Sequence, residues 1–298
     1  VSTRMLEACM LAAKRIVISM LLLILLLVTG CGQVPADTAS EEKTTPAAAG
    51  QDRLVIAGSG SNILITSKLA EAYRLKTGVA IEIPESIGST GAINAVTAGK
   101  LELGLVSRPL LEEERDAGLK EIPYARIAVT FAAHHAVADS NVTSDEVNEI
   151  LEGKKTTWSD GSKIYIFTRQ DSDSTNLILY NLIPGYQAIV TEANRSHRWQ
   201  TIYRNSDMSD ALKKTTGSFG LTTLPEICQP NSGIKALALD GVAPNRDNVL
   251  EGRYKPVVIL SFVYKQELGE RAARWIDFVF SQDGQQILND WEAIPIGR

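Results

Sequence analysis

The chain has 298 residues, a formal net charge of −5, 44% hydrophobic residues and 22% charged residues. These values are typical of a globular protein with one large or two small domains. The acidic balance argues against nucleic acid as a partner, because phosphate backbones select basic surfaces. An anionic small ligand is compatible with it, since a few donors in a cleft can outweigh the net charge.

The first thirty residues have the pattern of an export signal. Lys14 and Arg15 precede an apolar run, Ile16–Val28, which is short for a membrane span and typical of a signal-peptide core. The run ends at Gly30-Cys31, which resembles a bacterial lipobox. We therefore expect a signal peptide over 1–30, lipidation of Cys31 and a location on the extracytoplasmic face of the cell membrane. The alternatives are a plain signal peptide or one membrane helix.

Residues 31–52 are rich in Ala, Thr, Glu, Ser and Pro without apolar periodicity, which predicts a disordered tether. From residue 53 the patterns of strands and helices alternate. Strands are expected at 54–57, 80–83, 103–106, 124–133, 164–168, 219–222 and 257–263. Helices are expected at 63–76, 92–98, 143–151, 176–182, 208–215, 266–280 and 285–291. Thr143 and Glu146 have the spacing of a capping box at the start of one helix.

This alternation predicts an α/β protein with parallel, doubly wound sheets. The pattern restarts after the strand at 124–133, and the chain returns late, so we expect two doubly wound α/β lobes joined by a hinge. The predicted first lobe comprises 53–134 and 229–298, and the predicted second lobe comprises 135–228.

Three segments of small polar residues follow predicted strands and precede predicted helices: 58–62, 86–91 and 169–175. Free N–H groups at helix starts bind anions, and ligands of open α/β sheets bind at the carboxyl ends of strands. The three loops are therefore consistent with one shared anion site. For each loop alone, the alternative is a helix cap or a turn.

Two arginines lie where predicted strands end. Arg108 follows the strand at 103–106, and Arg169 follows the strand at 164–168. A guanidinium in such a place can fork onto an oxyanion, and the alternative is a solvated surface arginine. We expect no metal and no cofactor, since Cys, His and carboxylate residues lack metal-ligand spacing. Nucleophile-elbow, zinc-protease and phosphate-loop motifs are absent from the sequence.

Five segments in order resemble the phosphate-binding subunits of bacterial phosphate ABC importers, over about 245 residues from Leu54 onward. They are GSTGAI at 88–93, GLVSRPLLEEE at 104–114, EVNEILEGKKTTWSD at 146–160, LALDGVAPNRDNVLEGRYKP at 237–256 and SQDGQQIL at 281–288. The resemblance implies a type II periplasmic-binding fold, in which two lobes close over one anion by a hinge motion.

The resemblance further implies a solute-binding protein and not an enzyme. Its ligand would be phosphate or a related oxyanion, and its partners would be the membrane subunits of an ABC importer. We expect a monomer that does not bind nucleic acid. By position, Ser61 and Asn62 fall on the family's first binding loop, Ser89 on its second, and Arg169 and Thr175 on its third. The full set of expected ligand-binding residues is Ser61, Asn62, Ser89, Thr90, Ser107, Arg108, Arg169, Asp173, Ser174 and Thr175.

The third loop departs from the family pattern. The family usually has Arg-x-x-Gly-Ser-Gly-Thr, whereas residues 169–175 read Arg-Gln-Asp-Ser-Asp-Ser-Thr, so Asp173 replaces the ligand-binding serine. Some members also carry an aspartate that accepts the phosphate proton, where this chain has Ser107. Asp173 has two interpretations: it accepts that proton and so discriminates against sulfate, or it caps the helix at Asn176.

Two other functions compete with solute capture for transport. One is a degenerate member of the family that senses a ligand or partner without feeding an importer. The other is a hydrolase, which lacks a recognisable nucleophile–base pair in this sequence.

Overall fold

The structure is a computed structural model that describes residues 53–298. The expected signal peptide, Cys31 and the expected tether lie outside the described residues. Within the described part of the chain, no helix combines the length and the apolar character needed to cross a membrane.

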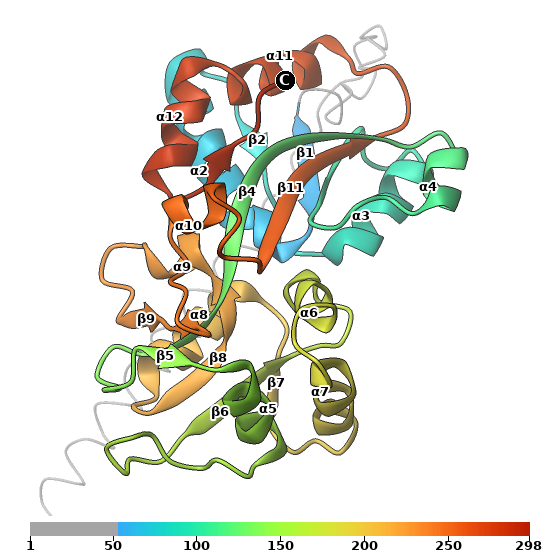
Figure 1. Cartoon of the computed structure of the whole chain (residues 1–298). Coiled ribbons are helices and arrows are strands. Elements are labelled where there is room, and N and C mark those ends of the chain that lie inside the picture. The colour runs from blue at the N-terminus through green and yellow to red at the C-terminus, as the bar shows by residue number, and fades with distance from the viewer. Residues whose placement is uncertain (1–52) are drawn as a thin grey trace, which may run out of the picture. The chain divides into compact units, whose positions relative to one another are not determined.

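The described chain alternates strands and helices from its start, as Figure 1 shows. The elements up to the long central strand are β1 (Leu54–Gly58), α2 (Gly60–Thr77), β2 (Ile81–Glu82), α3 (Gly88–Thr97), β3 (Leu103–Val106), α4 (Glu112–Asp116) and β4 (Lys120–His134). The next elements are β5 (Asn141–Val142), α5 (Ser144–Glu152), β6 (Tyr165–Arg169), α6 (Ser174–Tyr180), α7 (Tyr186–Arg195), β7 (Gln200–Ile202), α8 (Asn205–Lys214) and β8 (Ser218–Thr223). The last are α9 (Leu224–Ile227), β9 (Ile234–Ala236), β10 (Ala238–Leu239), α10 (Arg246–Leu250), β11 (Val257–Tyr264), α11 (Glu270–Val279), α12 (Gln282–Asp290) and β12 (Ile294–Pro295).

One ten-stranded sheet runs through the molecule in the order β2-β1-β3-β11-β4-β8-β6-β7, with β9 and β12 also paired to β4. β1 is parallel to β2 and β3, and β6 is parallel to β7 and β8, as expected from the alternating pattern. β11 and β4 are antiparallel to their neighbours, so the sheet is mixed and not wholly parallel. Strand β11 returns to the sheet late in the chain and is antiparallel to both β3 and β4. An antiparallel pair does not require the crossover connection that a parallel pair needs.

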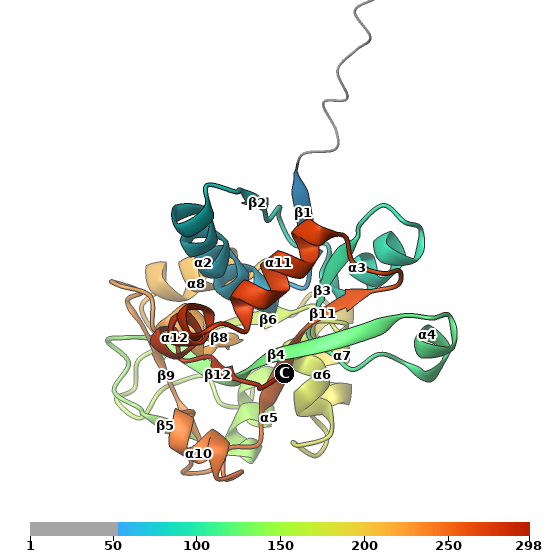
Figure 2. The ribbon, with the colours of Figure 1, turned by 90° about the horizontal axis from the view of Figure 1, so that it is seen from above.

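The long strand β4 connects two lobes (Figure 1). The first lobe contains β1–β3, α2–α4, β11, α11 and α12, and the second contains β5–β8 and α5–α8. In the first lobe, α2 and α11 belong to the main apolar cluster on one face of the sheet, while α3 packs on the other face through Ala92, Ile93 and Val96. In the view from above in Figure 2, α3 lies on the other side of β1 from α2 and α12.

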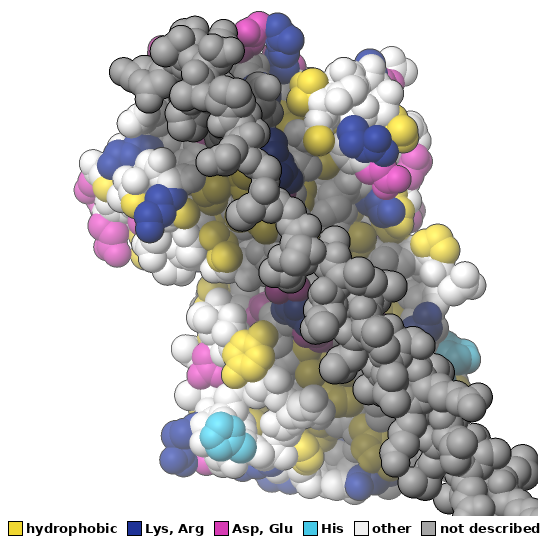
Figure 3. All heavy atoms as spheres, turned by 180° about the vertical axis from the view of Figure 1, so that it is seen from behind, with side chains coloured by type: hydrophobic (Ala, Val, Ile, Leu, Met, Phe, Trp, Pro, Cys, Tyr) yellow, Lys and Arg dark blue, Asp and Glu magenta, His cyan; other side chains and the backbone are white. Residues whose placement is uncertain are grey.

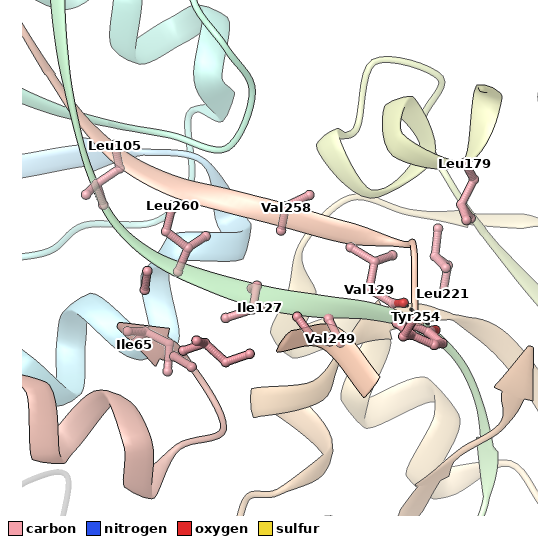
Figure 4. Packing of buried hydrophobic residues seen from close by; sticks show 14 of the residues in the cluster. Ile65, Leu105, Ile127, Val129, Leu179, Leu221, Val249, Tyr254, Val258 and Leu260 are labelled. Carbon is pink, nitrogen blue, oxygen red and sulfur yellow. Dashed lines mark hydrogen bonds between the residues drawn. The ribbon is translucent and has the colours of Figure 1, made fainter. Parts of the chain in front are cut away.

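The main core is continuous from one lobe to the other along β4 and β11. Ile127 and Val129 on β4 and Val258 on β11 are fully buried. Figure 4 shows these three side chains between residues of both lobes. In the second lobe, the rings of Phe131 and Phe219 stack with centroids 5.3 Å apart. The buried apolar residues of the two lobes therefore form one contiguous cluster.

The local patterns in the sequence located most elements correctly. The capping box is confirmed: Thr143 Oγ1 accepts from the Glu146 N–H at 3.1 Å, and Glu146 Oε2 accepts from the Thr143 N–H at 2.9 Å. Helices α3 and α6 begin earlier than expected, at Gly88 and Ser174. The expectation omitted several short elements and one longer helix: α4, β5, α7, β7, α9, β9, β10, α10 and β12.

The expected lobe boundaries stay a prediction, and the strand pairing bears on one of them. Residues 234–239 were expected in the first lobe. In the structure β9 pairs with β4 at Ala132–His134, and β10 pairs with β5, which lies in the expected second lobe.

Candidate ligand-binding site

The first of the three loops is fixed by close backbone contact between β1 and β3. The Ser59 N–H donates to the Leu105 carbonyl at 2.9 Å, and a Cβ on Gly58 would lie 2.0 Å from that same oxygen. Only glycine therefore fits at the end of β1. α2 begins two residues later and places Ser61 and Asn62, both buried, in its first turn.

Asn62 is fully engaged inside the protein. Its Nδ2 donates to Ser107 Oγ at 2.6 Å and to the Val106 carbonyl at 3.2 Å. Its Oδ1 accepts from the Tyr124 hydroxyl at 2.7 Å, and that hydroxyl lies 3.1 Å from Thr66 Oγ1. Both amide hydrogens are thus used, so in this structure Asn62 positions Ser107 at the end of β3 and offers no side-chain donor to a ligand.

The second loop is hydrogen-bonded to the first and to the end of β3. Ser86 Oγ donates to the Gly58 carbonyl at 2.9 Å, which holds the start of α3 against β1. Ser89 Oγ accepts from the Ser107 N–H at 3.1 Å and keeps its own hydroxyl hydrogen free to donate elsewhere. Thr90, the next residue, is exposed.

The third loop is built around a buried arginine. Arg169 ends β6 and is 3% exposed. Its Nε and Nη2 donate to Asp173 Oδ2 at 3.1 and 2.6 Å, and Nη2 also donates to Asn205 Oδ1 at 2.8 Å. Its Nη1 is buried without a hydrogen-bond partner among the described residues. Such an orphaned charged donor is unusual in a protein interior.

Asp173 caps α6, so the capping interpretation is observed, with the helix starting at Ser174 and not at Asn176. Asp173 Oδ1 accepts from the Thr175 N–H at 3.0 Å and from the Thr175 hydroxyl at 2.6 Å. With the two bonds from Arg169, the one carboxylate accepts four hydrogen bonds.

The two lobes touch at two places in this region. Ser61 Oγ in the first lobe lies 3.1 Å from Ser174 Oγ in the second. Nearby, Arg204 Nη1 donates to Glu85 Oε1 at 2.5 Å across the lobes, and its Nε donates to Asp207 within the second lobe at 2.7 Å. The first and third loops therefore face each other, as a shared site requires.

Arg108 does not join this group in the structure. Its guanidinium forms a two-pronged ion pair with Glu114 on α4, with Nη1 at 2.8 Å from Oε2 and Nη2 at 2.7 Å from Oε1. The hydrogen bond raises the pKa of Arg108 and lowers the pKa of Glu114. The fork that was expected to receive an anion is thus taken by a carboxylate six residues along the chain.

A cavity of about 370 Å³ lies beside the loops, between the lobes. The first lobe lines it with Gly60, Ile63, Leu64, Ser67, Glu85 and Ser86. The other side is lined by Arg204, Asn205, Ser206, Ser209 and Asp210 at α8, and by Glu226 and Gln229 at and after α9. Burial raises the pKa of Glu226, although hydrogen bonds from Ser209 at 3.1 Å and Gln229 at 2.8 Å oppose the shift. On the face shown in Figure 3, acidic and basic side chains are interspersed.

The structure places most of the expected residues in three hydrogen-bonded sets that adjoin along the chain at Ser61-Asn62 and at 173–175, and it leaves two residues outside this group. The group contains Ser61, Asn62, Ser89, Ser107, Arg169, Asp173, Ser174 and Thr175. Thr90 and Arg108 lie outside it. Sequence reasoning missed Asn205 and Glu226, because neither lies in a recognisable motif.

The chain belongs to the PBP superfamily: the family model described as "PBP superfamily domain" matches residues 43–283. The fold is the type II periplasmic-binding fold expected from the resemblance. The structure is similar to one from Clostridium perfringens, which is described as a phosphate ABC transporter substrate-binding protein with bound phosphate. The two structures superpose with a TM-score of 0.71, and their sequences are 27% identical. That match covers 82% of this chain and 99% of the other.

Two curated relatives are phosphate-binding proteins by name. Phosphate-binding protein PstS 2 of Streptococcus agalactiae is 32% identical over 133 residues, which is 44% of each chain. The match thus spans less than half the length of that relative. Phosphate-binding protein PstS of Bacillus subtilis is 24% identical over 303 residues, covering 95% of this chain and 94% of that one.

Proposed function

We propose that this protein is an extracytoplasmic solute-binding protein that captures phosphate or a related oxyanion for an ABC importer. The observation that carries the proposal is that the first and third loops meet across the two lobes, with the second loop bonded to the first and the buried Arg169 at the start of the third. Ser61 and Ser174 meet across the lobes at 3.1 Å, and Ser107 holds Ser89 at 3.1 Å. Hydroxyl and guanidinium donors of this kind suit an oxyanion.

Several lines support binding without catalysis. The family is one of binding proteins, and the relatives and the solved structure carry phosphate binding in their names. The polar residues of the three loops are serine, threonine, one asparagine, one glutamine, one arginine and two aspartates, with no histidine or cysteine in 58–62, 86–91 or 169–175. The relatives' names favour solute capture for transport over a sensor that is uncoupled from an importer.

The test of the ligand is calorimetry on the full chain, purified in detergent, with phosphate, sulfate, molybdate and tungstate. We expect saturable phosphate binding. Removing a charged donor in Arg169→Ala should weaken it by about 2–5 kcal/mol. Arg195→Ala is the matched control, since Arg195 is a surface arginine paired with Glu192 and 74% exposed. Wild type that binds none of the four anions would overturn the proposal, and equal affinity in Arg169→Ala would overturn the placement of the ligand.

We also propose that Cys31 is lipidated and anchors the protein to the membrane. The support is the apolar run that ends at Gly30-Cys31. In cells fed labelled fatty acid, Cys31→Ser should abolish labelling and move the protein to the soluble fraction or leave the leader uncut. Cys228→Ser is the control, because Cys228 is a free, exposed cysteine in the folded domain. A Cys31→Ser protein that is cleaved and still stays with the membrane would contradict lipid anchoring.

A further inference from the structure

The carboxylate of Asp173 accepts the same kinds of donor that would hold an oxyanion. It takes two N–H donors of the Arg169 fork, at 3.1 and 2.6 Å, on Oδ2. It takes a backbone N–H and a hydroxyl of Thr175, at 3.0 and 2.6 Å, on Oδ1. A charged fork, a backbone amide and a hydroxyl directed at one anion form the arrangement by which proteins hold carboxylates and phosphates.

The positive charges near the three loops are all paired with carboxylates of the same chain. Arg169 pairs with Asp173, Arg108 with Glu114, and Arg204 with Glu85 and Asp207. The Arg169–Asp173 pair is the buried one, with side chains 2% and 11% exposed. An anion that approaches Arg169 therefore meets a site whose charge is already balanced, and Asp173 would repel it at close range.

The same contacts show how the site could be vacated. Asp173 is the N-cap residue of α6, with an extended backbone at φ −64° and ψ 133°. From this loop position its carboxylate reaches the donors of both Arg169 and Thr175. A change of the Asp173 side-chain rotamer would therefore remove the carboxylate from both residues without moving β6 or α6. Arg169 stays anchored by Asn205, which accepts from Nη2 at 2.8 Å. The donors thus remain in place for another anion.

We propose that Asp173 is a tethered occupant of the oxyanion site, which an incoming ligand must displace from Arg169 and Thr175. The proposal rests on the proposed function and specifies how its site is regulated. Asp173 sets the ligand concentration at which the protein fills, so wild type binds phosphate more weakly than its donor set allows. This role differs from that of an acceptor for the phosphate proton, which would make Asp173 favour phosphate binding.

Calorimetric titration of phosphate into wild type, Asp173→Asn and Asp173→Ser, as full chains in detergent, tests the proposal. Both side chains can still cap α6, so the loop is kept while the charge is lost. We expect the dissociation constant for phosphate to fall by at least about tenfold in each variant, because a like charge no longer faces the ligand. The matched control is Asp171→Asn, which removes the same charge from the same loop. Asp171 accepts from Asn194 Nδ2 at 2.6 Å and is not bonded to Arg169 or Thr175, so its variant should bind within about threefold of wild type.

The outcomes separate the two proposals. Wild type that binds phosphate as tightly as the Asp173 variants, or more tightly, overturns the tethered occupant and leaves the proposed function standing. Equal tightening in Asp171→Asn also overturns it, since net charge alone would then explain the gain. If no variant binds phosphate, the proposed function itself fails.

A crystal structure of wild type with phosphate gives a check that needs no variant. We expect the Asp173 carboxylate to have left Arg169 and Thr175, with a phosphate oxygen on the donors it held. Phosphate bound while Asp173 keeps all four hydrogen bonds would overturn displacement.

Discussion

Replacing Asn62 should destabilise the protein through three buried hydrogen bonds. The side chain is 0% exposed and bonds to Ser107, Val106 and Tyr124 at 2.6, 3.2 and 2.7 Å. Each bond contributes about 1 kcal/mol net, and the partners left unpaired in a dry interior add to the loss. Asn62→Ala should therefore lower the free energy of unfolding by about 3–4 kcal/mol.

Tyr124 supplies the second half of a double-mutant cycle. Burial raises the pKa of its phenol, so the hydroxyl remains a donor to Asn62 over the whole working pH range. Tyr124→Phe should cost about 1–3 kcal/mol, because Asn62 Oδ1 loses its partner in a buried site. The double variant should be more stable than the sum of the two losses predicts, by about 1 kcal/mol, since both single changes remove the same bond.

Urea unfolding followed by circular dichroism measures these losses, with an unchanged m-value as the sign that the two states keep their compactness. An Asn62→Ala protein within about 1 kcal/mol of wild type would refute the bracing role. Losses that simply add in the double variant would refute the Asn62–Tyr124 bond as its basis. Loss of ligand affinity without loss of stability would instead assign Asn62 to direct ligand binding.

Three further changes follow from the structure. Burial raises the pKa of Glu226 above its ordinary value of 4.5, so the folded state holds this proton more tightly than the unfolded state. Wild type should thus lose stability as pH rises through that shifted pKa, and Glu226→Gln, melted at a series of pH values, should lack this loss; parallel pH profiles would contradict it. Gly58→Ala should cost about 3 kcal/mol in urea unfolding, because its Cβ would lie 2.0 Å from a backbone carbonyl of β3, whereas Gly297→Ala, with nothing within 4 Å, should be near neutral. Thr143→Ala should cost about 1 kcal/mol by removing the cap of α5, and an unchanged melting temperature would show that Glu146 alone holds that helix start.

The local pattern of apolar and polar residues was enough to predict the α/β class and most of the longer helices and strands. Helices and strands have different apolar periods, and a period is visible in a few neighbouring residues. The capping box at Thr143 and Glu146 was readable for the same reason, since all its atoms lie within one turn. α7 was overlooked although Tyr186, Val190 and Ala193 have helical spacing, because polar residues dominate the rest of the segment.

That the first and third loops lie close together was predictable from the order of the loops, but the contacts of each residue were not. The sequence showed that Asn62, Arg108 and Asp173 carry donors or charge at the ends of strands. It did not show that Tyr124, sixty-two residues away, uses Asn62, or that Glu114 takes the fork of Arg108.

A polar side chain can bind a ligand only with donors and acceptors that the protein has not already used. Residue type fixes how many such groups there are, and this much the sequence determined. How many remain free depends on atoms brought together from distant segments, as with Arg169, whose Nη2 is held by Asp173 and Asn205 while Nη1 has no partner among the described residues. Only the tertiary structure decided that, because hydrogen bonds form over about 3 Å and the chain must fold before those atoms come within reach.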